Sequence, residues 1–381
     1  MDEQALEAAE LYALRNIALS APDRDLNDLC DLEERIEAHL DDLRMAGRSA
    51  ARLAERTMRE GPGQLFVAAV LAFESSNKHS IANVLDCTVE APSRVDALVA
   101  ALTWMTPDQV EPLCAELAAT RSPSLRRAAL TASTIHRIDP GVMLRTALVD
   151  ADAALRAAAL AAAGELGIVS LASAVDMELE ADEPECRFSA ASSAALLGNR
   201  DRAADVLVQM AESGGPWSER ACRLAAGAIS LERGHRWLAG LAGLGPSRLV
   251  PIAAASLGDP RIVPALVEWM DHEPIARLCG EAFTTITGIR IRGDLARPNQ
   301  SRLRQLLPRL RYEPGVQYLL GQPRVGPWLR RVLLEGRQLE RAEAARAEII
   351  AQPGRPLFEL RDRGIRQRAR LVEAVDESAS R

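Results

Sequence analysis

The stretch ALRAAALAAAGELG, residues 154–167, decides the fold of this chain. It is almost wholly alanine, with Leu155, Leu160 and Leu166 as its only large apolar side chains. Alanine is the best helix former, but an isolated helix of about fourteen residues is marginal in water. An alanine methyl group also gains little from burial. The segment must therefore either pack closely among other helices or cross a membrane.

The charges of this stretch argue against a membrane span. Arg156 and Glu165 lie within it, and no run of about 18 or more uncharged apolar residues occurs in the chain. The first residues, MDEQALEAAELYAL, are acidic, whereas a secretory signal peptide begins with positive charge. We therefore expect a soluble, cytoplasmic protein that does not bind membranes.

The alanine-rich stretch recurs along the chain. Related copies include SLRRAALTAS from residue 124, CRFSAASSAALLG from residue 186 and IARLCGEAFTTITG from residue 275. A second amphipathic segment and a turn follow each copy. Each copy also carries one arginine, and these arginines are spaced 28 to 33 residues apart: Arg126, Arg156, Arg187, Arg220, Arg248 and Arg277. A repeated helix pair of this length predicts an all-α fold, a right-handed α-solenoid.

Charge and pattern divide the chain into three parts. Residues 1–60 hold 8 arginines and 15 acids, a net charge of −7, and are expected to form an N-terminal helical cap. Residues 61–288 hold 18 basic and 27 acidic residues, a net charge of −9, and are expected to form about eight repeats. Residues 289–381 hold 20 arginines and 11 acids, a net charge of +9, and are expected to form a basic, helical C-terminal cap.

Besides CRFSAASSAALLG, three further stretches carry a resemblance to known proteins, and the last of them is the most specific. They are DLEERIEAHLDDLRMAG at residues 31–47, GEAFTTITG at 280–288 and GVQYLLGQPRVGPWLRRVLLEGRQLERAEAA at 315–345. The chain resembles a family of bacterial HEAT-like repeat proteins that are often encoded beside type VI secretion components and their toxic effectors. The resemblance implies HEAT-like helical hairpins and an accessory role in that system. Family members commonly carry an acidic, proline-rich insertion after the ITG segment, and here only residues 289–302 occupy that place.

Acidic residues cluster in the turns between the expected repeats. The segment MELEADEPE holds five of them, DADA lies one repeat earlier, and EWMDHE lies further along the chain. Consecutive repeats would bring these turns to one edge, where an acidic ridge could bind a basic partner. A merely solvated edge is the alternative. The candidate residues are Asp150, Asp152, Glu178, Glu180, Asp182, Glu183, Glu185, Glu268, Asp271 and Glu273.

One tryptophan also lies in a turn. Trp217 stands in SGGPWSER, so it is a candidate anchor for a protein partner. The other tryptophans fall on helical patterns and are expected in the core: Trp104, Trp237, Trp269 and Trp328.

Catalytic and metal-binding motifs are missing from the sequence. The five histidines and six cysteines are scattered, without a CxxC or HExxH pair, and no GxGxxG or GxSxG motif occurs. We therefore expect no enzyme activity, no catalytic residue, and no metal or cofactor. Some DNA glycosylases are HEAT-like solenoids, but they need a basic face and aromatic side chains. Residues 1–288 carry a net charge of −16, from −7 and −9, so nucleic acid is not the expected partner.

Protein binding is therefore the expected function, and the resemblance gives it two forms. As an immunity protein, the chain would bind and neutralise a co-encoded toxic effector that acts in the cytoplasm, and nucleases with basic surfaces are one such class. As an adaptor or chaperone, it would hold an effector during loading onto the secretion spike. Salt sensitivity of binding would favour the first role. The sequence does not set the oligomeric state.

Overall fold

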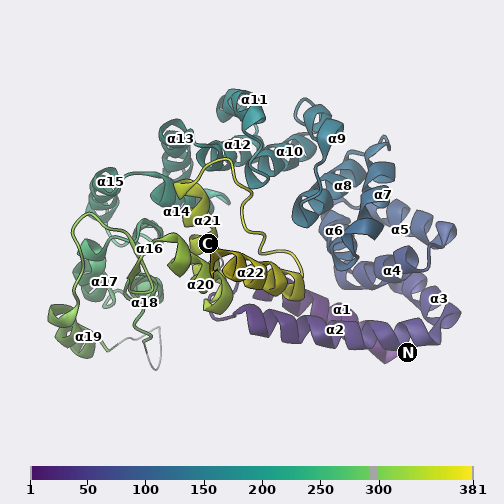
Figure 1. Ribbon diagram of the computed structural model, residues 1–381, viewed down its shortest axis with the longest axis horizontal. Helices are drawn as coiled ribbons and strands as arrows, with labels where there is room; N and C mark the ends of the chain where they lie inside the picture. The colour runs from purple at the N-terminus through teal and green to yellow at the C-terminus, as the bar shows by residue number, and fades with distance from the viewer. Residues whose placement is uncertain (1, 292–298, 380–381) are drawn as a thin grey trace. The chain divides into compact units, whose positions relative to one another are not determined.

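The computed structural model of this protein describes residues 2–291 and 299–379. These residues form 22 α-helices and one short pair of strands, which confirms the all-α fold class (Figure 1). Part of the segment that replaces the family's insertion, residues 292–298, lies outside the described residues. The helices form two compact units that interleave along the chain. Unit 1 comprises Met1–Leu166, Leu334–Arg341 and Phe358–Arg381, and unit 2 comprises Gly167–Leu333 and Ala342–Leu357.

Unit 1 contains the first ten helices and the last. In chain order they are α1 (Asp2–Ala18), α2 (Leu26–Ala46), α3 (Arg48–Thr57), α4 (Pro62–Glu74), α5 (Lys78–Glu90), the 3₁₀ turn Pro92–Arg94, α6 (Val95–Trp104), α7 (Pro107–Ala118), α8 (Pro123–His136), α9 (Gly141–Ala147), α10 (Ala153–Glu165) and α22 (Gly364–Ala379). Helices α4, α6, α8 and α10 contact one another in succession, and α5, α7 and α9 flank them.

Unit 2 contains the remaining helices and the strand pair. The helices are α11 (Ala172–Met177), α12 (Pro184–Leu197), α13 (Arg200–Glu212), α14 (Ser218–Ala228), α15 (Leu231–Gly243), α16 (Leu249–Leu257), α17 (Val263–Trp269), α18 (Glu273–Thr287), α19 (Gln300–Leu306), α20 (Gly326–Glu335) and α21 (Gln338–Ala351). Short 3₁₀ turns occupy Val169–Leu171, Glu178–Glu180, Pro260–Ile262 and Leu307–Arg309. The antiparallel strands are β1 (Tyr318–Leu319) and β2 (Gln322–Pro323). Residues 334–341, at the junction of α20 and α21, belong to unit 1.

The alanine-rich helices lie at the centre of each unit. We call α4, α6, α8 and α10 of unit 1, and α12, α14, α16 and α18 of unit 2, the core helices. In α10, side chains on several faces are buried, including Leu155, Ala157 and Leu160. In α16, the eight residues from 250 to 257 are all buried. Small side chains let helix axes approach closely, so alanine suits helices that have neighbours on more than one side.

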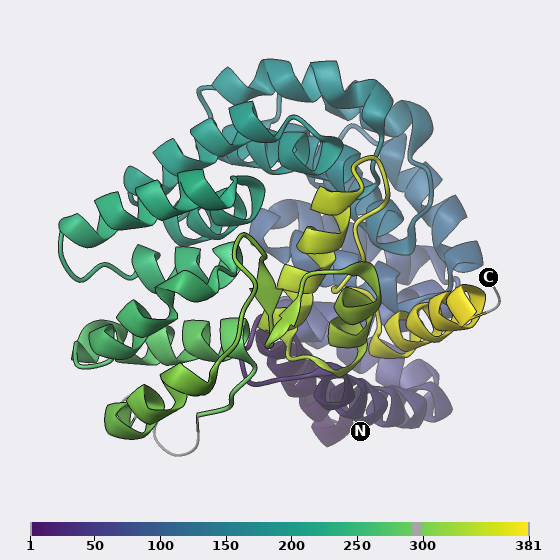
Figure 2. The same cartoon turned by 60° about the vertical axis from the view of Figure 1, so that its left-hand side comes forward.

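The C-terminal region covers the C-terminal ends of core helices in unit 2. The guanidinium group of Arg324 donates hydrogen bonds to Ala255 O at 3.1 Å and Ser256 O at 2.7 Å, at the end of α16. The backbone N–H groups of Leu320 and Gly321 donate to carbonyls at the end of α18. These donors satisfy carbonyls that a helix leaves unpaired, and the positive charge suits that end of the helix dipole. Figure 2 shows the strand pair; Leu320 and Gly321 lie in the turn between its strands, and Arg324 follows β2.

Two glycines permit this close approach. Gly258 and Gly288 follow α16 and α18 with φ values of 65° and 73°, a left-handed conformation that favours glycine. A Cβ atom at Gly258 would lie 2.5 Å from Tyr318 O, and one at Gly288 would lie 2.5 Å from Leu320 O. A larger residue at either position would therefore push the C-terminal region away from the helix end.

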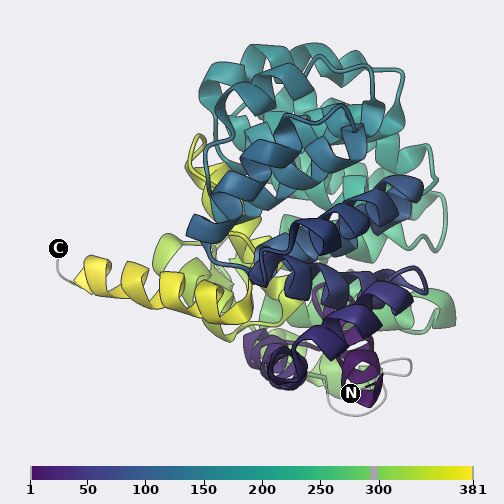
Figure 3. The same ribbon diagram turned by 90° about the vertical axis from the view of Figure 1, so that its right-hand side faces the viewer.

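In unit 1 the segment that begins at residue 358 likewise covers the C-terminal end of a core helix. Helix α22 packs against α2 (Figure 3). Arg366 donates to Thr103 O and to Met105 O, the latter at 3.1 Å, at the end of α6. The guanidinium group of Arg363 lies over the Trp104 ring, 4.3 Å from its centre. Arg324, Arg363 and Arg366 of the basic C-terminal region therefore make contacts within the protein, where the sequence predicted only a basic cap.

Buried ion pairs hold this segment in unit 1. Glu33 accepts hydrogen bonds from Arg15 Nε and from the backbone N–H of Gly364, both at 2.7 Å. Asp362 is fully buried and pairs with Arg366 at 2.6 Å and Arg370 at 3.0 Å. Such pairs fix a geometry, because removing one partner leaves a buried charge.

The three-part division expected from composition, with boundaries after residues 60 and 288, stays a prediction. The two units follow tertiary contacts, whereas the expected boundaries follow charge and sequence pattern. Both units include residues of the basic C-terminal region.

Candidate functional site

Most of the residues predicted to bind a partner lie at or shortly before the N-terminal ends of core helices, and Glu268 lies in α17. Asp152 is the N-cap residue of α10 in unit 1. In unit 2, Glu183 is the N-cap of α12, Trp217 that of α14, and His272 that of α18. The C-terminal region covers the other ends of core helices, namely the C-terminal ends of α16 and α18. We call the residues at the starts of α12, α14 and α18 the N-terminal edge of unit 2.

The two candidates of unit 1 have structural roles. Asp150 accepts hydrogen bonds from Arg126 at 2.7 Å and from the backbone N–H of Asp152 at 2.9 Å. The Asp152 N–H and Arg126 together hold the pKa of Asp150 below its ordinary value. Asp152 in turn accepts from the N–H of Leu155 at 2.9 Å and caps α10. Both side chains are half-buried, so their carboxylates already serve the turn and the helix start.

The acidic stretch of residues 178–185 is much more open. Glu178–Glu180 forms a 3₁₀ turn, and Pro184 begins α12 directly after Glu183. Glu178 is half-buried, and the other four acids are exposed: Glu180, Asp182, Glu183 and Glu185. Glu180 pairs with Arg202 at 2.8 Å, but its side chain is 81% exposed. An exposed pair of this kind adds little stability, so the stretch presents a concentrated negative charge to solvent.

The second acidic group of unit 2 lies around the start of α18. Glu268, Asp271 and Glu273 are all exposed. Glu268 accepts two hydrogen bonds from Arg304, at 2.9 and 2.6 Å, and these lower its pKa. Asp271 and Glu273 stand at the beginning of α18, where negative charge is favoured by the helix dipole. The acids therefore stabilise the helix start while remaining accessible.

Trp217 is half-buried at the start of α14. Its ring stacks on Phe188, with centres 4.6 Å apart and planes at 28°. The Arg220 guanidinium lies over both rings, 4.9 Å from Phe188 and 5.1 Å from Trp217. The tryptophan is thus a fixed aromatic surface that is open on part of its area, as an anchor residue would need to be.

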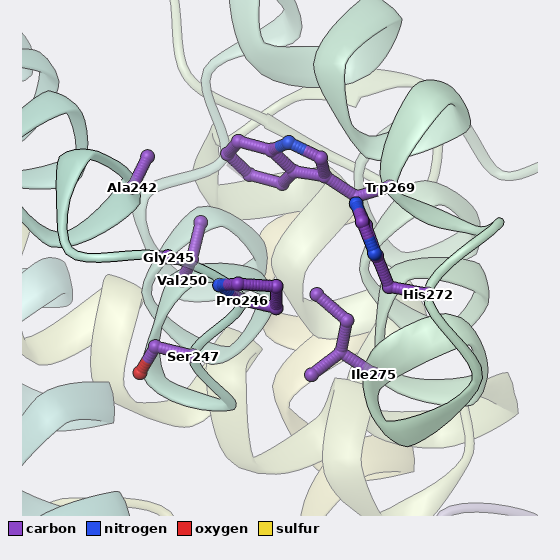
Figure 4. Close-up of a pocket in the computed structure, with 8 residues that line it drawn as sticks. All are labelled: Ala242, Gly245, Pro246, Ser247, Val250, Trp269, His272 and Ile275. Atoms are coloured by element: carbon purple, nitrogen blue, oxygen red, sulfur yellow. The ribbon is translucent and has the colours of Figure 1, made fainter.

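A pocket opens close to the start of α18. Its volume is about 250 Å³, and its walls are Ala242 of α15, the loop 245–247, Val250 of α16, Trp269 of α17, and His272 and Ile275 at α18. Trp269 and His272 come from one side, and Ala242 and Val250 from the other (Figure 4). The walls are mostly apolar side chains.

An exposed leucine lies beside this pocket. Leu244 immediately precedes the loop and is 87% exposed. Trp269 was expected in the core, and that prediction is wrong: its side chain is only half-buried and forms a wall of the pocket. Trp104 is buried as expected, whereas Trp237 and Trp328 are half-buried, so the prediction is wrong for them as well. Helical periodicity places Trp269 on the inner face of α17, but it cannot show whether neighbouring side chains cover it. The Gly-Pro pair in the loop was the one signal of an opening there.

The described residues hold no group of three or more histidine, cysteine or acidic side chains placed to bind a metal ion. All six cysteines are buried and unpaired by disulfides, and burial raises the thiol pKa of Cys222 and Cys279 to about 12. Among the described helices, none has a stretch long and apolar enough to span a membrane. The chain matches no protein-family model, no curated protein and no solved structure.

Proposed function

We propose that this protein is a protein-binding α-solenoid rather than an enzyme. The contacts support the solenoid, because each core helix packs on the next within both units and flanking helices pack beside most of them. The alanine content supports it as well, because close stacking of helices on several sides is what such sequences permit. A solenoid offers long edges relative to its core, and these edges are suited to protein partners.

The partner is a protein with a basic surface, and it binds the N-terminal edge of unit 2. One observation carries this proposal: four exposed carboxylates stand within six positions at the start of α12, namely Glu180, Asp182, Glu183 and Glu185. Complementary charge accelerates association and selects among partners. Following the resemblance to HEAT-like proteins encoded beside type VI secretion components, we infer a cytoplasmic immunity protein that blocks a co-encoded toxic effector. Nucleases are one class of toxin whose basic surface would match this edge.

The experiment is co-expression with the toxin-like protein encoded next to this chain, with cell survival and co-purification measured together. Survival with a stable complex is the expected result. A complex that forms while the cells still die would contradict the immunity role and favour an adaptor for effector loading. Absence of any complex would contradict both roles.

A matched pair of variants tests the acidic edge. In the first, Asp182, Glu183 and Glu185 are replaced by Ser, and in the second, the exposed acids of α7 are replaced by Ser: Asp108, Glu111 and Glu116. Each variant loses three negative charges. We expect the first to associate at least about tenfold more slowly at low salt and the second to change little. Equal effects would mean that only net charge matters.

One observation favours the adaptor role as a second candidate. The pocket beside Leu244 is apolar and could hold part of an unfolded or extended effector. Binding through apolar contacts alone is insensitive to salt, whereas binding through the acidic edge weakens as salt screens the charges. The dissociation constant measured across a range of salt concentrations therefore separates the two roles.

A further inference from the structure

The C-terminal end of α6 is covered jointly by one histidine and by residues 358–379, which we call the C-terminal segment. His136, the last residue of α8, donates a hydrogen bond from Nε2 to Leu102 O at 3.1 Å. The guanidinium group of Arg366 donates to the next carbonyl along α6 and to Met105 O. A helix leaves its last carbonyls unpaired, so α8 and the C-terminal segment satisfy them together.

The imidazole of His136 is only 4% exposed. Because Nε2 donates to a carbonyl, the neutral ring carries its free lone pair on Nδ1. Nδ1 is buried and has no hydrogen-bond partner among the residues that the structure describes. A second proton on this ring would therefore create a buried donor and a buried positive charge without an acceptor, which is an unfavourable arrangement.

The charges of the C-terminal segment act on this ring. Asp362 is fully buried and carries one negative charge, whereas Arg366 and Arg370 beside it carry two positive charges. Burial lowers the pKa of His136 from 6.5, and the two arginines lower it further, whereas the Leu102 carbonyl and the carboxylate act in the opposite direction. The covered ring therefore stays neutral to a lower pH than an exposed ring does.

Two further titratable groups lie on helices packed against α8. Cys114 of α7 contacts α8, and burial raises the pKa of its thiol to about 11, so the thiol stays uncharged near neutral pH. Glu165 of α10 pairs with Arg361 of the C-terminal segment at 2.5 Å, and burial raises its pKa. Both Glu165 and Arg361 act on Arg137, the residue that follows His136. Glu165 is therefore the group from which a response of His136 must be distinguished.

We propose that His136 makes the C-terminal segment an acid-sensitive latch, because protonation of the ring favours a state in which the segment has left the end of α6. In the released state the ring is exposed and binds a proton in its ordinary range, and the α6 carbonyls bind water. Because the released state binds this proton more tightly than the covered state, its population rises as the pH falls below about 6.5. This latch does not depend on which partner binds the N-terminal edge of unit 2.

Hydrogen exchange of backbone amides in the full-length protein tests the latch. Protection factors, which are corrected for the intrinsic pH dependence of exchange, are compared for α22 and α4 at about pH 7.5 and about pH 5.5. One proton bound only by the released state raises its population up to about tenfold between these values. We expect the protection of α22 to fall about fivefold to tenfold and that of α4 to stay constant. An equal fall in both helices, or no fall in α22, would overturn the proposal.

Three glutamine variants identify the titrating group. His136→Gln retains an amide donor for Leu102 O but cannot gain a proton, so we expect the protection of α22 to lose its pH dependence. His79→Gln, at an exposed position of α5, and Glu165→Gln should both retain it. A pH dependence that persists in His136→Gln, or one that is lost in Glu165→Gln, would overturn the assignment to His136.

Arg370→Gln keeps the test decisive if His136→Gln does not fold. The side chain of Arg370 is 33% exposed, and its replacement removes one positive charge beside the ring while Asp362 remains. The covered ring then accepts a proton more readily, so the pH dependence of α22 protection should become smaller than in the native protein. An equal or larger dependence would contradict the latch.

Discussion

The two ends of the core helices differ in whether their charged side chains are buried or exposed. At the C-terminal ends, charged side chains are drawn into the protein, as with Arg324 on α16 and the Asp362–Arg366 pair near α6. At the N-terminal ends, acids such as Glu180 stand in solvent. Buried charges depend strongly on their partners, whereas exposed pairs contribute little. The C-terminal ends therefore contribute more to stability, whereas the acids before α12 and α18 are exposed.

The largest effect is expected where a buried carboxylate is removed. Asp362→Ala leaves Arg366 and Arg370 without their shared acid, so we expect a loss of about 3–5 kcal/mol in the free energy of unfolding. Urea denaturation followed by circular dichroism measures it. Glu373→Ala, on an exposed position of α22, is the control and should change little. A loss below about 1 kcal/mol for Asp362→Ala would mean that the buried pair does not hold the segment.

A smaller loss is expected at the end of α16. Arg324→Ala removes the donors to Ala255 O, Ser256 O and Tyr318 O. Hydrogen bonds from a charged group contribute about 1.5–3 kcal/mol, and we expect a loss in that range by the same measurement. Arg302→Ala, at an exposed position of α19, provides the comparison. Equal effects of the two substitutions would contradict the capping role of Arg324.

The pH dependence of stability tests a buried carboxylate, that of Glu343. Burial acts to raise the pKa of Glu343, but Arg346, Arg223 and Arg324 outweigh it, so its pKa is lowered from 4.5. The stabilisation from Glu343 is therefore present above about pH 4.5 and is lost as the pH falls through the lower, folded-state value.

The urea midpoint should therefore fall on acidification in the native protein, and less so in Glu343→Gln. Parallel curves for the two proteins would show that this carboxylate is not held in its charged form.

The smallest effect is expected at the N-terminal edge. Glu180→Ala breaks the exposed pair with Arg202, and we expect a change within about 0.5 kcal/mol in the free energy of unfolding. A thermal melt of the variant beside the native protein is sufficient to measure it. A marked loss of stability would mean that this edge is structural, and the difference between the two ends would disappear.

Much of the local structure was predictable from sequence. The alanine-rich copies predicted the core helices, because helix propensity acts over a few residues. The prediction that Trp269 lies in the core was wrong because it used the pattern of a single helix. Periodicity identifies the side of a helix that faces the core, but whether the core fills the space in front of one residue depends on loops elsewhere, here residues 245–247.

The sequence by itself determined that the chain is all-α, where its core helices lie and that acids precede several of them. Only the tertiary structure decided what the basic C-terminal region does. Arg15 donates to a carbonyl 346 residues away at Arg361, and Arg366 reaches Thr103. Arginine periodicity predicts a helix and a charged face, but it cannot identify a hydrogen-bond partner so distant in the chain. Such partners are chosen when buried carbonyls and carboxylates must be satisfied, and that requirement exists only in the folded protein.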